Sequence, residues 1–456
     1  MKAVNIKGKD YITVNERLIH FRAESVFTNW AIIETIVSLD DKEGVFKVEI
    51  LNEHGNIIVT AHAQEYRDSS YINKTSFLEN GFTMQSTNGS LNASGGKYIY
   101  MAFAADPTTI EPSLEDSFNT VTYTGDGTTN NPITSVGFQP DLVWIKNRDY
   151  SGGISHQIFD SVRGDTAGSG GSLSSNNANA EYFDGTKGVK SFNLDGFTLD
   201  GGVNGEYGVN GAPGGTYGSE YVSWNWKGAE LPAINSNGSI PSVVSANPAA
   251  GFSIVSTKSN GSGYLNFGHG LDSAPKLVIT KFTSQAGEWY TYTSAIANGF
   301  DVALKLNGTD AAITAYGADK WSSTDSVVGV GNPQWYFTAN VPFITYCFHS
   351  VAGFSKFGSY TGTGNTSGQI VLTGFEVAFL LVKKATGAAD DWFIFDNKRT
   401  PVGEAYIRPN SSSQELDYGG DFMRIDATDG FQPIWSSPAI NASGETYIYM
   451  AFANQF

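Results

Sequence analysis

Cysteine is almost absent from this chain, since Cys347 is the single cysteine among 456 residues. One cysteine excludes an intrachain disulfide and a multi-cysteine zinc site. Charged residues are also scarce, at 16% against the ~25% of ordinary soluble domains. Much of the polar surface must therefore come from Ser, Thr, Asn and Gly, and stability must come from apolar cores or from assembly.

Positive charge is also in short supply. Lys and Arg together number 28 against 45 Asp and Glu, which gives a formal net charge of −17. Most nucleic-acid affinity comes from Lys and Arg contacts to phosphates. The composition therefore argues against a general nucleic-acid binder.

Long hydrophobic runs are missing as well. The longest apolar run, Val377 to Val382, is far shorter than the ~18 residues that a membrane-spanning helix needs. The first ten residues, Met1 to Asp10, contain no apolar targeting segment. We therefore expect a protein that is made in the cytoplasm, carries no secretion signal and does not insert into a membrane.

An internal repeat is the most informative feature that is present. The segment Asn92–Ala104 returns as Asn441–Ala453 with 11 of 13 positions identical, and weaker copies of its last strand occur at Tyr221–Trp226 and Phe343–Phe348. At ~100–200 residues per domain the chain has room for three or four domains. The four copies therefore predict four units, each ended by the same strand.

These closing strands alternate in polarity. The second, fourth and sixth positions of every copy are apolar: Ile99, Met101, Phe103; Val222, Trp224, Trp226; Ile344, Tyr346, Phe348; and Ile448, Met450, Phe452. A period of two places alternate side chains on opposite faces of a strand. We therefore predict half-buried strands of antiparallel sheets, with one face in a core.

A second set of strands also recurs. Each ends in a lysine at the matched place, in the segments 141–146, 276–281 and 378–383. Asp160 and Asp396 then recur at matched positions in two of the units. A catalytic residue rarely needs to recur, so we predict that these two carboxylates make turn or strand-end hydrogen bonds.

The steps between closing strands exceed the ~20–50 residues of solenoid and propeller repeats, so each unit is domain-sized. We predict a mainly β chain of tandem antiparallel β-sandwich domains, lectin-like or jelly-roll, that extend outward as separate blocks. The predicted ranges are 1–80 (a small α+β docking module), 81–110 (a partial repeat or strand pair packed on that module), 111–232 (repeat A), 240–350 (repeat B) and 354–456 (repeat C).

The first 80 residues differ from the rest and hold a larger share of the charge. Val14–Arg22 can form one amphipathic helix, with Val14, Leu18 and Phe21 on a common face. Alternation then predicts a strand at 45–50 that turns back into a second strand at 57–66. These elements predict an α+β module with a boundary near residue 80.

Several segments resemble a known family. The stretches 347–362, 137–148 and 159–164 are similar to a repeat in structural proteins of marine and cyanobacterial tailed phages, and the resemblance extends over residues 81–456. It implies a virion tail or fibre-like protein with lectin-like sandwich domains. It assigns no binding residue.

The first segment resembles a different family. Residues 9–17 and 70–80 are similar to a small phage protein associated with single-strand DNA recombination. That family continues with a further helix, whereas this chain turns into Gly81-Phe82-Thr83. We interpret the segment as a borrowed fold that docks the protein onto a virion.

Motifs for catalysis and metal binding are lacking. The chain has no HExxH, no C-x-x-C and no G-x-S-x-G, and its closest histidine pair, His54 and His62, spans a predicted hairpin. The adjacent carboxylates Asp390-Asp391 and Asp40-Asp41 would point to opposite faces of a strand, so they cannot flank one glycosidic bond. We predict no catalytic residue, no metal and no cofactor.

Three aromatic residues are the candidate ligand-binding residues. Trp321, Trp335 and Tyr336 lie in repeat B amid polar loop sequence, where exposed rings could stack against sugars. Packing in the core is the competing interpretation, and the one that large aromatic side chains favour.

Together these features predict a non-enzymatic virion structural protein, a tail fibre or tail appendage that adheres to host-surface glycans. Repetition on a symmetric assembly, with a homotrimer favoured, would turn weak contacts into useful avidity. Its expected partners are other virion proteins. The alternatives are a tail-associated polysaccharide depolymerase, a capsid or tail decoration protein without receptor binding, and a DNA-annealing protein, which the negative charge disfavours.

Overall fold

The computed structural model divides the chain into two compact units, Met1–Ile110 and Glu111–Phe456. The residues that the structure describes are 3–6, 9–12, 31–39, 43–51, 57–66, 75–78, 81–84, 116–164, 171–183, 188–201, 208–211, 218–229, 231–261, 264–297, 300, 302–314, 321–331, 340–366, 368–400, 405–417, 422–427, 429–434 and 437–453.

In its described residues the first unit contains three small antiparallel sheets, β1-β2, β3-β4-β5 and β6-β7. Its strands are β1 (Ala3–Ile6), β2 (Lys9–Ile12), β3 (Ala31–Leu39), β4 (Glu43–Leu51), β5 (Ile57–Tyr66), β6 (Thr75–Leu78) and β7 (Gly81–Met84). The predicted pairing of strands 45–50 and 57–66 is confirmed by β4 and β5. The predicted helix at 14–22 lies outside the described residues. The pair β6 and β7 joins residues on both sides of the predicted boundary at residue 80.

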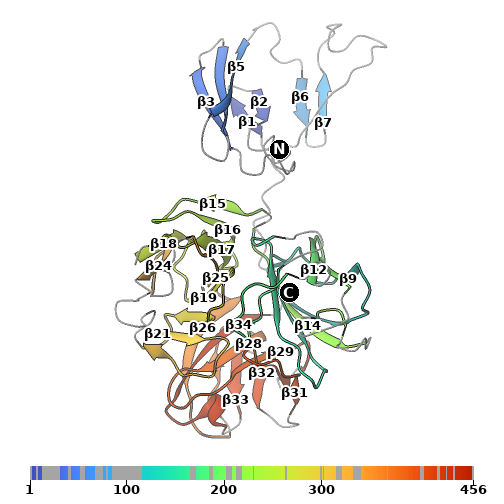
Figure 1. Ribbon diagram of the computed structural model, residues 1–456, viewed down its shortest axis with the longest axis vertical. Coiled ribbons are helices and arrows are strands. Elements are labelled where there is room, and N and C mark those ends of the chain that lie inside the picture. Colours follow the sequence, from blue (N-terminus) through green and yellow to red (C-terminus); the bar gives the residue numbers. More distant parts are fainter. Residues whose placement is uncertain are drawn as a thin grey trace. The chain divides into compact units, whose positions relative to one another are not determined.

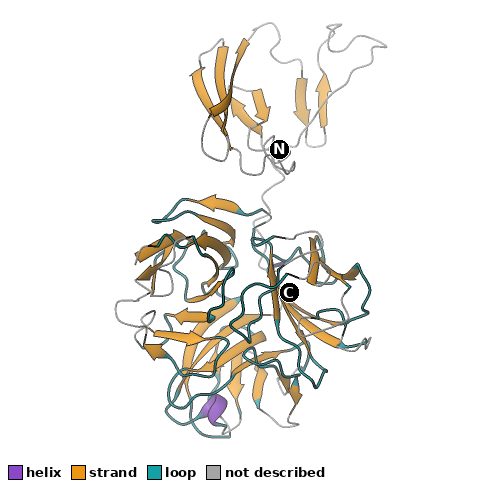
Figure 2. Cartoon of the chain, viewed as in Figure 1, coloured by secondary structure: helices purple, strands orange, loops and turns teal. Residues whose placement is uncertain are grey.

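The second unit is mainly β, with a single short helix in its described part, α3 (Pro438–Asn441) (Figure 2). Repeat A contains β8 (Phe118–Thr124), β9 (Asn131–Ile133), β10 (Leu142–Asn147), β11 (Gln157–Asp160), β12 (Gly188–Asn193), β13 (Gly196–Asp200) and β14 (Glu220–Trp226). Among the described residues, no helix has the length and apolarity that crossing a membrane requires.

Repeat B and the segment before it contain the largest sheet. The strands are β15 (Ala233–Asn235), β16 (Ser242–Asn247), β17 (Phe252–Lys258), β18 (Tyr264–Gly268), β19 (Leu277–Phe282), β20 (Tyr290–Thr293), β21 (Val302–Lys305), β22 (Ile313–Thr314), β23 (Trp321–Ser323), β24 (Val327–Gly331) and β25 (Pro342–Phe348). Repeat C contains β26 (Ser355–Thr361), β27 (Val371–Leu372), β28 (Val377–Lys384), β29 (Trp392–Asp396), β30 (Ala405–Tyr406), β31 (Leu416–Asp417), β32 (Met423–Ala427), β33 (Gly430–Pro433) and β34 (Thr446–Ala453).

One four-stranded arrangement occurs in all three repeats. We call it the inner sheet, and its antiparallel strand orders are β8-β14-β10-β11, β17-β25-β19-β20 and β26-β34-β28-β29. In repeat C its strands are β26, β34, β28 and β29, which are labelled in Figure 1. The repeated closing strand lies second in each order, between the first strand of the repeat and the lysine-bearing strand. The sequence repeat therefore corresponds to a repeat of sheet topology.

The three closing strands that the structure describes, β14, β25 and β34, are buried on both faces, so for them the prediction of half-buried strands is wrong. The first copy, at 98–103, lies outside the described residues. In β14, the polar-face residues Ser223 and Asn225 are as buried as Trp224 and Trp226, all four at 1% exposure or less. The strands β10, β19, β25, β28 and β34 are similarly buried along almost their whole length. Each inner sheet is therefore covered by protein on two sides.

One face of every inner sheet contributes to a single shared core. The second, fourth and sixth positions of all three described closing strands belong to one hydrophobic cluster, the central core: Val222, Trp224, Trp226, Ile344, Tyr346, Phe348, Ile448, Met450 and Phe452. The Phe452 ring of repeat C stacks on Phe118 of repeat A, with centroids 4.8 Å apart. The prediction of separate blocks that extend outward is therefore wrong, because these large apolar faces cover one another.

The opposite face of each inner sheet packs within its own repeat. Three further clusters lie there, one for each repeat, and each also takes residues from a three-stranded outer sheet. The outer sheets are β12-β13-β9, β18-β24-β23 and β27-β33-β32. This second set of cores explains why the polar-face positions are also inaccessible to solvent.

Candidate functional site

The first predicted binding residue is part of a core. Trp321 lies on β23, is 3% exposed and stacks on Tyr292, with ring centroids 4.6 Å apart. A ring in this position offers no face to a sugar, so core packing is the role that the structure gives it. Trp335 and Tyr336 lie outside the described residues.

Of the two adjacent carboxylate pairs that the sequence analysis judged unable to flank a glycosidic bond, the structure describes Asp390-Asp391. Both carboxylate oxygens of Asp391 are engaged, one by Arg408 at 2.9 Å and one by the Asn410 amide at 2.7 Å. Asp40-Asp41 lies outside the described residues. No three His, Cys, Asp or Glu side chains among the described residues are grouped so that they could hold a metal ion.

The recurring aspartates make the predicted turn hydrogen bonds. Asp160 Oδ1 accepts from the Arg163 backbone N–H at 2.9 Å, and Asp396 Oδ1 accepts from the Arg399 backbone N–H at 2.9 Å. This prediction is confirmed. Each aspartate also forms an ion pair with the arginine three residues later, at 2.6 Å, and the side chains of Asp396 and Arg399 are both fully buried.

The other oxygen of each aspartate accepts a bond from the closing strand of a neighbouring repeat. Tyr346 Oη of repeat B donates to Asp160 of repeat A at 2.7 Å, and Trp224 Nε1 of repeat A donates to Asp396 of repeat C at 2.9 Å. These bonds join segments 186 and 172 residues apart in sequence. The Asp–Arg pairs therefore lie at contacts between repeats, which the sequence analysis did not predict.

Repeat B replaces this polar set with an apolar one. The strand pairing places Thr293 at the position of Asp160 and Asp396. Thr293 pairs with Leu277, at the same place in the lysine-bearing strand as Leu142, the partner of Asp160, and Phe379, the partner of Asp396. Three residues later stands Ile296, which packs against the central core. Met450 takes the position of Trp224 and Tyr346 in the closing strand of repeat C. Both the buried Asp–Arg pair and the side chain of the neighbouring repeat that bonds to the aspartate are therefore replaced at this contact.

The matched lysines are buried at the contacts between repeats, which we call seams A–B, B–C and C–A. Each Nζ donates to the carbonyl of the residue after it and to a carbonyl of a neighbouring repeat. The neighbouring acceptors are Ala178 for Lys281 at 3.4 Å, Thr309 for Lys383 at 3.2 Å and Ser412 for Lys146 at 3.2 Å. The three repeats therefore contact one another in a closed ring, A to B, B to C and C to A.

Further bonds repeat around the same ring. The carbonyls of Ala178, Thr309 and Ser412 also accept backbone N–H groups across the seams, from Gly287, Asp390 and Ile154. Trp289 and Trp392 donate through Nε1 to carbonyls of the neighbouring repeat, both at 2.8 Å. His156 takes the matching position in repeat A. Its Nδ1 accepts from Trp144 Nε1, so Nε2 carries the hydrogen and donates to the Arg408 carbonyl at 3.0 Å.

Burial lowers the pKa of all three lysines, to about 7 for Lys146 and about 8 for Lys281 and Lys383. In the unfolded chain the amines hold their protons up to about pH 10.4. Between the folded and unfolded pKa values the unfolded state binds more protons, so the stability of the folded unit rises with pH there. Below the folded pKa values the lysine contribution is constant.

We expect the free energy of unfolding to increase between about pH 8 and pH 9.5, and Lys281→Met to remove about one third of the part of that slope that comes from lysines. Chemical denaturation at a series of pH values measures this slope. The exposed Lys276→Met, next to the same strand, is the matched control for loss of one positive charge. Equal slopes for wild type and Lys281→Met would contradict the assignment.

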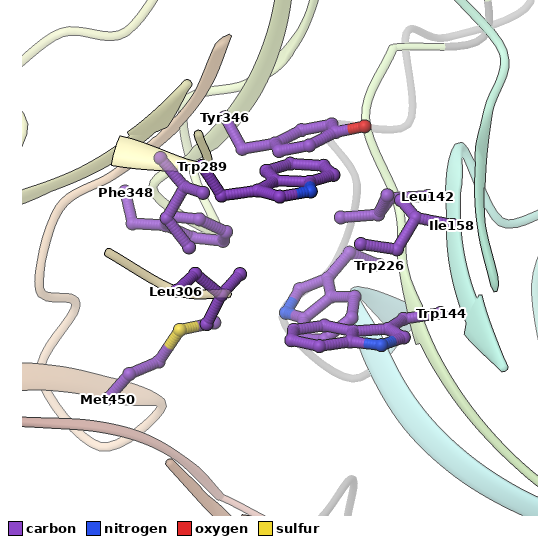
Figure 3. A pocket seen from close by; sticks show the side chains of 10 residues that line it. Leu142, Trp144, Ile158, Trp226, Trp289, Leu306, Tyr346, Phe348 and Met450 are labelled. Atoms are coloured by element: carbon purple, nitrogen blue, oxygen red, sulfur yellow. The ribbon is translucent and has the colours of Figure 1, made fainter. Parts of the chain in front are cut away.

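The cavity in the central core is too small for a ligand. Its volume is about 20 Å³ and its lining is apolar, with Trp144 from repeat A, Trp289 from repeat B and Met450 from repeat C around it (Figure 3). Small-molecule sites usually occupy roughly 300–1,000 Å³. The cavity is therefore a packing gap where the three repeats meet.

Two neighbouring aromatic residues on repeat A are exposed instead. Tyr182 and Phe183 are 39% and 59% exposed. They follow Glu181, which pairs with Arg163 just as Glu415 pairs with Arg399 in repeat C. In repeat C the next two residues are Leu416 and Asp417. This difference can be found in the sequence by comparing the two repeats around their Asp–Arg–Glu sets.

The family model described as Domain of unknown function (DUF7483) matches residues 27–107 and 112–455. No curated protein and no solved structure matches the chain.

Proposed function

The chain belongs to the family described as Domain of unknown function (DUF7483), and we propose that it is a non-enzymatic structural protein of a phage virion. In this proposal it forms part of a tail fibre or tail appendage and adheres to glycans on the host surface. Other virion proteins are its partners, and three chains assemble as a homotrimer, which multiplies weak contacts.

The main support for a structural role is that the three repeats contact one another in a closed ring. The recurring lysines donate to carbonyls of neighbouring repeats, and Asp160 and Asp396 accept bonds from neighbouring repeats. The arginines that pair with these two aspartates lie in the same repeat as the aspartates. Residues that repeat for this reason stabilise a scaffold. We further propose that each inner sheet and its outer sheet form a lectin-like sandwich, which is supported by the separate cluster that each sheet pair encloses.

The exposed pair Tyr182 and Phe183 supports adhesion. Aromatic rings provide flat apolar faces on which sugar rings stack. The Phe183 side chain is 59% exposed, and no equivalent pair of aromatic residues follows Glu415 in repeat C. The proposal therefore assigns glycan contact to this surface of repeat A.

Two measurements test the proposal. Mass spectrometry of purified phage particles should detect the chain, and the purified protein should bind host cells or their envelope glycans without releasing new reducing ends. Release of reducing ends would instead indicate a depolymerase. A protein that is absent from particles and does not bind cells would contradict the proposal.

Substitution locates the surface. The double variant Tyr182→Ala/Phe183→Ala should weaken binding to cells by about fivefold or more, because two stacking faces are lost. Leu194→Ala removes another exposed apolar side chain of repeat A, 86% exposed, and should leave binding unchanged. Similar losses in both variants would contradict an aromatic-specific site.

A further inference from the structure

The three seams share a backbone contact, so their side chains can be compared position by position. At each seam one backbone N–H donates to a carbonyl across it: Glu181 to Thr283 at A–B, Ala312 to Ala385 at B–C and Glu415 to Arg148 at C–A, at 2.8, 2.8 and 2.9 Å. The residues on either side of this bond are therefore equivalent in the three seams. The side chains at these equivalent positions differ from one seam to the next.

Seam C–A alone carries an ion pair across these positions. Arg148 Nε and Nη2 donate to the two carboxylate oxygens of Glu415, both at 3.0 Å. At seam A–B, Glu181 pairs with Arg163 of its own repeat and faces Thr283. At seam B–C both positions are alanine. Within the part of the chain that the structure describes, no other ion pair joins two repeats.

The pair at seam C–A continues into the core. Glu415 also accepts from Arg399 at 2.8 Å, Arg399 pairs with Asp396 at 2.6 Å, and Asp396 accepts from Trp224 of repeat A at 2.9 Å. The network therefore starts and ends in repeat A and passes through repeat C. Planar, two-point pairing between a guanidinium and a carboxylate is among the stronger polar contacts in proteins.

Seam C–A differs from the other two seams because its two repeats are not consecutive in the chain. Repeats A and B follow one another in the chain, as do repeats B and C, so the peptide chain limits how far each of these pairs can separate. Repeats A and C are held together only by non-covalent contacts such as the stacking of Phe118 on Phe452. Seam C–A is therefore the one seam whose opening no short peptide connection restricts directly.

We propose that the Arg148–Glu415 pair is a latch that keeps the ring of repeats closed, and that seam C–A is the first seam to open. The two side chains are 20% and 16% exposed. They are thus sufficiently buried for a strong pair and sufficiently exposed for dissolved ions to compete with it. Opening separates the faces of repeats A and C and gives solvent access to the central core.

Hydrogen exchange of the three equivalent amides tests the latch in the full-length protein. In Arg148→Gln, the Glu415 amide should exchange about tenfold faster or more, as expected for loss of a charged hydrogen bond, with smaller changes at Glu181 and Ala312. Arg408→Gln is the matched control, because it breaks an ion pair of similar exposure within repeat C. It keeps the backbone carbonyl that accepts from His156 across the seam, so all three amides should be unchanged.

High salt provides a second test that needs no variant. Raising the salt concentration to about 1 M shortens the screening length to about 3 Å and should accelerate exchange at Glu415 more than at Glu181 or Ala312. Equal acceleration of the three amides by salt or by Arg148→Gln would overturn the proposal, as would no change at Glu415. If Arg148→Gln does not fold, the salt series on the wild type decides the question.

Discussion

Replacing Asp396 by alanine is expected to lower the free energy of unfolding by about 3–5 kcal/mol. The side chains of Asp396 and Arg399 are fully buried, so the variant leaves a buried guanidinium without its nearest carboxylate. It also removes the acceptor of Trp224 Nε1 in the neighbouring repeat. Chemical denaturation with linear extrapolation measures the loss.

Repeat B provides the matched control for this prediction. Thr293 occupies the equivalent position, is 2% exposed and bonds only locally, from the Ala295 N–H to its hydroxyl at 3.1 Å. Thr293→Ala should cost about 1 kcal/mol, the value of one ordinary hydrogen bond. Similar losses for Asp396→Ala and Thr293→Ala would show that the buried ion pair adds no more to the free energy of unfolding than one ordinary hydrogen bond.

The double variant Asp396→Thr/Arg399→Ile gives repeat C the two residues that stand at these positions in repeat B, Thr293 and Ile296. Removing both charges avoids the unpaired guanidinium, so the double variant should be less destabilised than Asp396→Ala despite carrying two changes. A double-mutant cycle measures this non-additivity. Additive losses would indicate that the two residues act independently.

Replacing Phe452 by alanine is expected to cost about 3–5 kcal/mol as well, because the change opens a cavity in a packed aromatic cluster. Phe452 is 1% exposed and its ring lies near Phe118 of repeat A at 4.8 Å, Phe348 of repeat B at 6.3 Å and Phe379 of repeat C at 6.2 Å. The variant should accelerate hydrogen exchange in the closing strands of all three repeats.

Phe431→Ala is the control for the shared core. Phe431 is also fully buried, but its ring contacts are Tyr360 and Tyr449 of its own repeat. Its effect on exchange should centre on repeat C. If Phe452→Ala also changed hydrogen exchange in repeat C alone, the repeats would open as separate blocks. The shared core would then not couple the stability of one repeat to that of the others.

The sequence alone was sufficient for three of the four predicted closing strands, while the first copy, at 98–103, lies outside the described residues. Alternating apolar residues identified the closing strands, and spacing identified the equivalent lysines and aspartates. The turn hydrogen bonds of Asp160 and Asp396 were predictable because a recurring aspartate after a strand has few other uses. A period of two requires only a few neighbouring residues, and a matched position requires only that similar segments of the sequence be compared.

What covers each face was decided by the tertiary structure. Alternation places Trp224 and Trp226 on one face of a strand, but it does not say whether that face meets the same repeat or two others. The partner of Trp224 is Asp396, 172 residues away, and no periodicity links two such positions. The closed ring, the burial of Lys146 and the pair of Arg148 with Glu415 depend on contacts of this kind, so only the folded chain determines them.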